Sequence, residues 1–220
     1  MYRLLSYPLS PKTPLYGKTA PVSVNIKRRQ TKEGCCVSEA RVSFSNHSGT
    51  HVDAPKHFYP EGKAIGQCDI SDLIFVSPKV IDCPKGEREL VVPDDLRSIP
   101  SGCDMLILRT GFYKYRGRDK YRTDNPGVSA AAAEYVRRNF PSVMALGIDA
   151  ISVSCFQKRE EGRKAHRVFL GREGYDAAPV FLVEDMDLSG DLSGLKKVFI
   201  VPLFFKGVDS MTCTVIGEFD

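Results

Sequence analysis

Apolar and polar residues follow two patterns along this chain that are typical of β-strands. Alternation with a period of two over residues 22–26 and 37–44 predicts two half-buried strands. Apolar runs bounded by turn residues predict further strands that are buried on both faces, at 80–83, 105–109, 143–148, 180–183, 198–201 and 212–216. We therefore expect a sheet in which most of the strands are buried.

A helical pattern is clearest after Ser129. Ser129 suits an N-cap, apolar residues recur at four-residue steps from Ala132 to Phe140, and Pro141 ends the pattern. A shorter helical turn is predicted over residues 165–170. Strands outnumber helices, so this pattern predicts a mixed α/β fold.

The length of 220 residues favours a single domain over residues 1–220. Its first 21 residues are rich in Pro, Ser and Thr, which predicts an extended N-terminal arm with turns. There is no internal repeat, no apolar run long enough to cross a membrane, and no signal-peptide pattern at the start. We expect a cytoplasmic protein.

Charge and cysteine usage exclude several classes of protein. The net charge of +4 is modest and the basic residues are spread along the chain, so neither a nucleic acid nor a membrane is the expected partner. The seven cysteines form an odd set that includes the vicinal pair Cys35–Cys36 and contains no C-x-x-C motif. We expect reduced thiols that fill the core, rather than disulfides or a thiolate zinc site.

The residues most informative about chemistry lie in the segment N46-H-S-G-T-H-V-D-A-P-K-H57. Glycine, proline and β-branched residues oppose a helix here, and an extended chain places His47, His51 and Asp53 on one side, with Gly49 between the histidines. Two imidazoles and a carboxylate bind zinc, manganese or iron(II) and leave positions open for water. The segment therefore predicts a metal site.

His57 follows Pro55, which turns the chain. We expect that turn to bring His57 back to the site as a catalytic acid/base, because an imidazole can exchange protons near neutral pH. Spacing alone does not decide whether His166 caps a helix, lines the core or belongs to the site. Nor does it decide whether Glu184, after the strand at 180–183, faces the site or the solvent.

The run H47-S-G-T-H-V-D-A-P-K-H57 resembles the H-x-G-T/A-H-x-D-x-P-x-H signature of the cyclase-like metal-dependent hydrolases. This family contains bacterial kynurenine formamidase and isatin hydrolase. The likeness extends along most of the chain, with similar segments at 5–14, 106–111, 147–153, 183–189 and 201–205. One departure is L15-Y-G-K-T19, where formamidases usually carry a W-P-G-D-like stretch; this chain has no Trp.

The resemblance implies a swivelling β/β/α domain that assembles as a homodimer or higher homo-oligomer. It also implies one or two divalent metals per chain, Zn²⁺ or alternatively Mn²⁺. The first metal is held by the residues at His47, His51 and Asp53. A second shares Asp53 and adds His166 and Glu184.

Our functional hypothesis is hydrolysis of an amide, a formamide (such as N-formylkynurenine) or a cyclic amide by metal-bound hydroxide, with no bound organic cofactor. The expected partner is a small, aromatic substrate, for which Tyr7, Tyr16 and residues 112–121 are candidate pocket walls. A small anionic ligand near residues 158–167 is a further candidate. The rival functions are a metal-dependent cyclase or dehydratase and a non-catalytic metal-binding protein.

Overall fold

The computed structural model describes residues 1–31, 34, 36–172 and 174–220. The strands are β1 (Tyr2–Leu4), β2 (Ser23–Gln30), β3 (Cys36–Ser43), β4 (His51–Asp53), β5 (Ile74–Phe75), β6 (Pro78–Asp82), β7 (Leu90–Val91), β8 (Met105–Arg109), β9 (Gly127–Val128), β10 (Ala145–Ile148), β11 (Phe181–Glu184), β12 (Leu195–Pro202) and β13 (Ser210–Phe219). The helices are α1 (Asp119–Thr123), α2 (Ala130–Asn139) and α3 (Arg159–Leu170). Short 3-10 turns are η1 (Pro55–His57), η2 (Ile65–Gln67), η3 (Ile70–Leu73), η4 (Pro93–Leu96), η5 (Phe112–Tyr115) and η6 (Phe156–Lys158).

A mixed sheet organises the molecule. Among the described residues it has nine strands, in the order β5-β12-β13-β4-β11-β10-β8-β6, with β1 added beside β13. The pairs among β6, β8, β10 and β11 are parallel, while β4 pairs antiparallel with both β11 and β13. β4 therefore joins the parallel half of the sheet to the antiparallel half.

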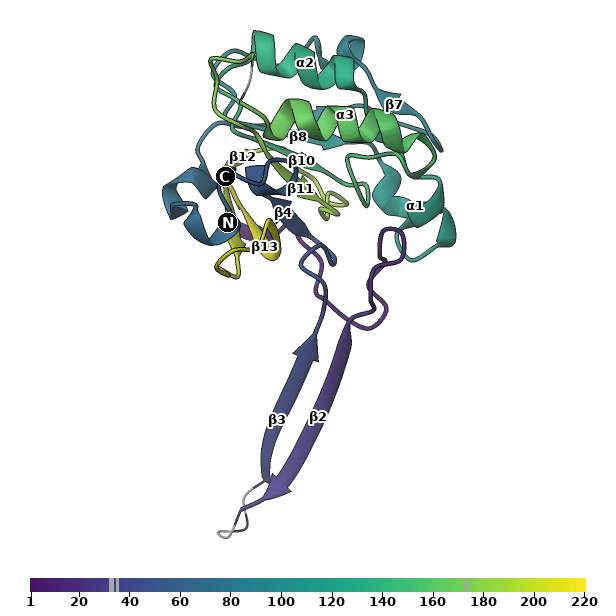
Figure 1. The fold of residues 1–220 in the computed structure, drawn as a ribbon, viewed down its shortest axis with the longest axis vertical. Coiled ribbons are helices and arrows are strands. Elements are labelled where there is room, and N and C mark those ends of the chain that lie inside the picture. Colours follow the sequence, from purple (N-terminus) through teal and green to yellow (C-terminus); the bar gives the residue numbers. More distant parts are fainter. Residues whose placement is uncertain (32–33, 35, 173) are drawn as a thin grey trace.

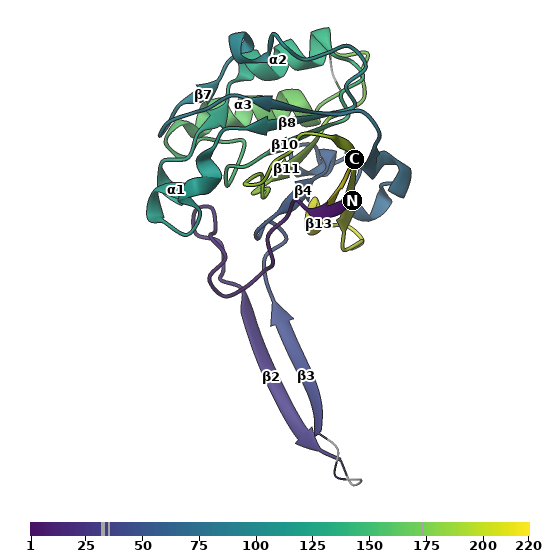
Figure 2. The ribbon, with the colours of Figure 1, turned by 180° about the vertical axis from the view of Figure 1, so that it is seen from behind.

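Two hydrophobic cores cover the two faces of the parallel strands. Leu106 and Leu108 of β8 pack under α2 and α3, whereas Met105 and Ile107 pack against β12 and β13 on the other face. Because both faces are buried, these strands are continuous apolar runs instead of alternating ones. Figures 1 and 2 show α2 and α3 lying over β8 and β10. The predicted β/β/α architecture is confirmed.

The predicted strands from 80–83 onward are confirmed as β6, β8, β10, β11, β12 and β13. The helix after Ser129 is also confirmed, and the Ser129 side chain accepts a hydrogen bond from Ala132 N as its N-cap. The helical turn predicted at 165–170 is the end of a longer helix, α3, which begins at Arg159.

The two strands predicted at 22–26 and 37–44 exist, but the expectation that they are half-buried is wrong. They are β2 and β3, a hairpin that projects away from the body of the molecule (Figures 1 and 2). Every residue of β3 is exposed. The alternation of apolar and polar residues predicts a hairpin with one apolar face, but it does not predict which surface covers that face.

Two expectations from composition are tested within the described residues. No helix there is long and apolar enough to cross a bilayer. The six described cysteines are all free thiols, and five of them are buried, as expected of core fillers. Cys35 lies outside the described residues.

Candidate metal centre

Strand β4 carries two of the predicted ligands. It lies between β11 and β13, with Asp53 in register with Leu182 on one side and Ser210 on the other. Side chains alternate along a strand, so His51 and Asp53 point to one side while Val52 enters the core. An imidazole and a carboxylate therefore lie together at the centre of the sheet.

His47 reaches the site through a turn, and the predicted extended course from His47 to Asp53 is wrong. Residues 46–50 form turns and bends, and Gly49 has a φ of +65°. A Cβ on Gly49 would lie 2.6 Å from Leu9 Cδ2, so neither this backbone conformation nor this contact suits another residue. The turn brings His47 back until its Nδ1 lies 3.1 Å from Asp53 Oδ1.

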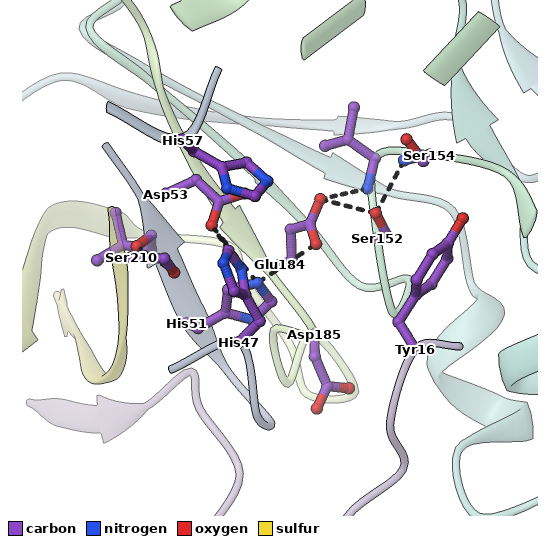
Figure 3. A network of polar contacts seen from close by, with 12 residues as sticks. Tyr16, His47, His51, Asp53, His57, Ser152, Ser154, Glu184, Asp185 and Ser210 are labelled. Carbon is purple, nitrogen blue, oxygen red and sulfur yellow. Dashed lines mark hydrogen bonds and ion pairs between the residues drawn. The ribbon is translucent and has the colours of Figure 1, made fainter. Parts of the chain in front are cut away.

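Asp53 is the centre of the cluster. Its Oδ1 lies 3.7 Å from His51 Nε2, yet this buried oxygen accepts no hydrogen bond. His51 Nδ1 donates to the Gly49 carbonyl at 2.8 Å, so in the neutral ring the lone pair is on Nε2, which faces the carboxylates. Figure 3 shows the imidazoles and carboxylates converging.

His166 and Glu184 join the same cluster from other elements. His166 Nε2 lies 3.4 Å from Glu184 Oε1 and 3.9 Å from Asp53 Oδ2. The His166 Nδ1 donates to the Gly162 carbonyl of α3 at 2.8 Å, so in the neutral ring the lone pair is again on Nε2. Glu184 Oε1 accepts hydrogen bonds from Ser152 Oγ and Val153 N, which fix the carboxylate.

These donors fit a divalent cation. A ligating histidine typically donates its second ring N–H to a carbonyl or carboxylate, as His51 and His166 do here. Donor atoms of His47, Asp53 and His57 lie within 4.8 Å of one another, and so do those of His51, Asp53 and Glu184. A cation would also bind the buried Asp53 Oδ1, which accepts no hydrogen bond from the protein. The structure thus brings all six predicted site residues together, with Asp53 in both groups.

The electrostatics of the cluster are those of tightly paired opposite charges. Burial alone would lower the pKa of His47, but the Asp53 and Asp209 carboxylates outweigh it and raise the pKa to about 10. The same competition between burial and carboxylates raises the pKa of His51 and His166. Although burial opposes it, the neighbouring histidines lower the pKa of Asp53 and Glu184.

These shifts predict that metal uptake releases protons. Without metal, His47 keeps its proton at neutral pH because its pKa is about 10, and a cation must displace that proton. The apparent affinity should therefore rise with pH, by about tenfold per pH unit for each proton displaced. Calorimetric titration with Mn²⁺ between pH 6 and 8, in buffers of different ionisation heat, measures the protons released. Heats that do not depend on the buffer would contradict this prediction.

Asp209 is a residue of the site that sequence reasoning missed. His57 Nδ1 lies 2.6 Å from Asp209 Oδ2, and His47 Nε2 lies 3.3 Å from the same oxygen. Asn46 Nδ2 donates to the other Asp209 oxygen at 2.8 Å. Asp209 precedes β13, more than 150 residues from the motif, and no local spacing marks it.

A buried network behind the ligands was also missed. Asp185, next to Glu184, accepts two hydrogen bonds from Arg116 and one from the Tyr121 hydroxyl. Its own carbonyl accepts from Thr50 Oγ1 at 2.6 Å. The network therefore ties β11 to the residue beside His51, and holds the two ligand-bearing segments together.

The residues of the cluster line a cavity of 310 Å³, within the usual size of small-molecule sites. Among the candidate aromatic walls, Tyr16 lines this cavity. Phe112 and Tyr121 instead belong to a small buried core. The Arg116 guanidinium carbon lies 3.8 Å from the centroid of the Tyr7 ring.

Comparison with known proteins gives concordant results. Residues 4–154 match the family model named Cyclase. A curated protein of Haemophilus influenzae, described only as uncharacterized, is 32% identical over 108 residues, which are 47% of this chain and 76% of that protein.

Among solved structures, isatin hydrolase A from Labrenzia aggregata superposes with a TM-score of 0.79 at 20% identity, over 99% of this chain and 93% of that one. A protein from Bacillus stearothermophilus that is described as a predicted metal-dependent hydrolase superposes with a TM-score of 0.75 at 22% identity, over 99% of this chain and 97% of that one. At these identities the structural matches establish the fold.

Proposed function

This chain belongs to the cyclase family, and from that premise and the geometry of the metal centre we propose that it is a metal-dependent hydrolase of amide, formamide or cyclic amide bonds. The resemblance to the cyclase-like metal-dependent hydrolases is thereby confirmed. Isatin, after which three of the structural neighbours are named, contains a cyclic amide, and this supports the proposed class of bond.

The observation that carries the proposal is an oriented imidazole beside a cluster of cation ligands. The rings of His57 and His47 lie 4.5 Å apart between centroids, and Asp209 accepts from His57 Nδ1. Nε2 of His57 is thus left with a lone pair that can take a proton. A proton acceptor next to a Lewis-acid site is the arrangement that hydrolysis of an amide requires.

In this proposal the residues of the site have two separate roles, metal binding and proton transfer. His47, His51 and Asp53 hold one cation, and His166 and Glu184 join Asp53 in holding a second. When bound, a divalent cation such as Zn²⁺ or Mn²⁺ polarises a carbonyl and lowers the pKa of water from about 15.7 toward about 7. His57 accepts the proton from the attacking water and returns it to the leaving nitrogen. Asp209 holds the ring in the tautomer that makes this transfer possible.

Turnover by purified protein of known metal content tests the proposal. Protein loaded with Zn²⁺ or Mn²⁺ is given N-formylkynurenine, formanilide, isatin and a set of hydroxy acids. We expect cleavage of at least one C–N bond and its loss after chelation, restored by adding metal. Dehydration of a hydroxy acid with no C–N cleavage would favour the cyclase or dehydratase alternative. No turnover at full metal content would favour a binding protein.

We also propose that the protein forms a homodimer through the β2–β3 hairpin. The register pairs Val24 with Val42 and Ile26 with Ala40, which makes one face of the ribbon apolar. Val24, Val42 and Ile26 are 42%, 50% and 62% exposed. An isolated two-stranded hairpin is marginal in water, so covering this face by a second copy would stabilise it.

Substituting serine at Val24, Ile26 and Val42 should convert the dimer into monomer. Losing the burial of three partly exposed side chains would weaken the dimer by about 100-fold in Kd. Sedimentation velocity over a range of concentrations measures the change. Val76→Ser, which alters a residue outside the hairpin that is at least as exposed, is the matched control. A wild-type protein that stays monomeric at high concentration would refute the proposal.

A further inference from the structure

A second cavity lies at the opposite end of β11 from the metal ligands. Its volume is 420 Å³, against 310 Å³ for the cavity beside the ligands, and the two share no lining residue among the described parts of the chain. Phe181 begins β11 and lines this second cavity, whereas Glu184 ends β11 at the metal ligands. The proposed hydrolysis makes no use of the second cavity.

The walls of the second cavity are mostly apolar. Two of their side chains, Leu170 and Phe181, are 1% and 5% exposed, so they belong to the interior of the protein. Sites for small molecules are typically concave, mostly apolar and about 300 to 1000 Å³ in volume. The second cavity has this size and this character. Its apolar lining residues are Pro55, Met144, Leu170, Ala178, Pro179 and Phe181.

The charged residues that line the second cavity balance one another. Lys63 pairs with Asp72 at 3.3 Å, while Glu61 and Arg172 add one negative and one positive charge. A charged ligand would lose its water here without meeting a net opposite charge, which is costly. The balance of charges therefore favours an uncharged ligand, and a wall that contains the Phe181 ring favours an aromatic one.

The loop of residues 55–63 separates the two cavities. Pro55 and Tyr59 line the second cavity, whereas His57 and Phe58, which lie between them in the sequence, line the first. Adjacent side chains of one short loop thus form walls of both cavities. A ligand in the second cavity would contact the loop that positions His57.

This loop is tightly closed on itself. Lys56 N donates to the Lys63 carbonyl at 3.1 Å, and Gly62 N donates to the Tyr59 carbonyl at 2.7 Å. A Cβ on Gly62 would lie only 2.7 Å from the carbonyl carbon of Pro55. Because the backbone is packed so closely, we expect a displacement on one side of the loop to be carried to the other side.

Helix α3 provides a second link between the cavities. His166 lines the first cavity, and Leu170, one turn later on the same face, lines the second. The loop holds this helix at two points: Phe58 stacks on His166 at 5.1 Å between ring centroids, and the Tyr59 hydroxyl donates to the Arg167 carbonyl at 2.9 Å. Any change in the position of His166 should therefore reach the walls of the second cavity.

The wall formed by Ala178 and Pro179 is fixed by a buried arginine. Arg137 is 3% exposed, and its guanidinium donates to the carbonyls of Gly171, Ala177 and Ala178. Within the described residues no carboxylate pairs with Arg137, so its hydrogen bonds go to this wall. The second cavity is therefore preformed, as small-molecule sites usually are.

We propose that the second cavity is an effector site, which binds an uncharged aromatic molecule and is coupled to the metal centre through the loop of residues 55–63 and α3. A cation held by His166 would fix the helix and the Phe58 ring that stacks on it. Metal binding should then order the walls of the second cavity and strengthen ligand binding there. The proposal involves the metal ligands but does not depend on the reaction that they catalyse.

Fluorescence titration with 2-naphthalenemethanol tests the proposal. The chain has no Trp, so the naphthalene emission is observed without a tryptophan background. We expect saturable binding of one molecule per chain to the Zn²⁺-loaded protein. The charged analogues 2-naphthylmethylamine and 2-naphthalenesulfonate should bind about tenfold more weakly or less. Removing Zn²⁺ should weaken binding of 2-naphthalenemethanol by about fivefold or more, the usual lower limit of coupling between two sites.

Variants locate the bound probe. Ala178→Phe places a ring in the second cavity and should weaken binding at least tenfold, and Lys63→Phe tests the opposite prediction of an intact site from another lining position. Ala177→Phe is the matched control, because Ala177 is half-buried like Ala178 and its carbonyl also accepts from Arg137, but it lines neither cavity. Ser45→Phe, which narrows the first cavity, should also leave the Kd unchanged.

Several results would overturn the proposal. They are the absence of saturable binding, equal affinity for the charged analogues, binding that survives both Ala178→Phe and Lys63→Phe, loss of binding in Ser45→Phe, and a Kd that does not change with Zn²⁺. A metal-loaded protein that hydrolyses no substrate would refute the proposed function but would leave these binding measurements unaffected. The two proposals can therefore fail separately.

Discussion

Replacing Asp53 with asparagine is expected to abolish both metal binding and activity. Asp53 belongs to both groups of ligand atoms, and its buried Oδ1 accepts no hydrogen bond from the protein. An asparagine amide keeps the shape but removes the charge that holds a cation. Loss of the polarising ion should reduce turnover by about 10³-fold or more. Elemental analysis for metal per chain, together with turnover of whichever substrate the wild type accepts, measures both effects.

Two companion variants show whether the loss is specific. Asp119→Asn removes a carboxylate whose side chain is 90% exposed, and should change neither metal content nor turnover. His166→Ala removes a residue assigned to the second cation only, so protein that carries two ions should keep one. An Asp53→Asn protein that retains its full metal content would refute the metal centre as described.

The buried parts of the fold were predictable because their determinants are local. Parallel strands such as β8 and β10 are apolar on both faces, so their sequences are short apolar runs that turn residues interrupt. The helix α2 carries its own N-cap in Ser129. The β2–β3 hairpin was predicted as strands but not as an exposed arm, because its alternation is equally compatible with a sheet that packs on a core.

The same distinction applies to the site: residues placed by local structure were predictable from the sequence, and residues brought in from distant parts of the chain were not. His47, His51, Asp53 and His57 lie within eleven residues, so a single turn and strand place them, and the segment shows this directly. Asp209 and Arg116 reach the same site from distant parts of the chain, through the pairing of β13 with β4 and through a loop that packs beside β11. No spacing in the sequence indicates that these two residues lie near the motif. His166 and Glu184 were assigned only through the family resemblance, since their separation from the motif carries no geometric information.

Gly49 shows how a correct assignment can rest on a wrong reason. The sequence suggests that it clears space between two histidines on an extended strand. In the structure it occupies the left-handed region, and its carbonyl orients His51. A mutation here is therefore expected to act on the orientation of the ligands, because any side chain would meet Leu9.

Replacing His57 with alanine is expected to slow turnover while the metal stays bound. The ring is oriented by Asp209, so it can move a proton between water and the leaving nitrogen, and such general acid/base catalysis is typically worth about 10²- to 10⁴-fold. Because donor atoms of His57 also lie near those of His47 and Asp53, a role as metal ligand is the alternative. Metal content decides between them: a catalytic His57 leaves it intact, and a ligand His57 lowers it.

Asp209→Asn gives an independent test of the same assignment. Asparagine keeps the shape of Asp209 but can turn its amide N–H toward the ring and so orients His57 less strictly, and turnover should fall by about 10- to 100-fold, the usual cost of losing a residue that orients a site histidine. If His57 is the base and Asp209 acts through it, the double variant should turn over no more slowly than His57→Ala alone. A His57→Ala enzyme with the pH profile and turnover of the wild type would remove His57 from the mechanism, and the proton would then have to move through another group at the cluster.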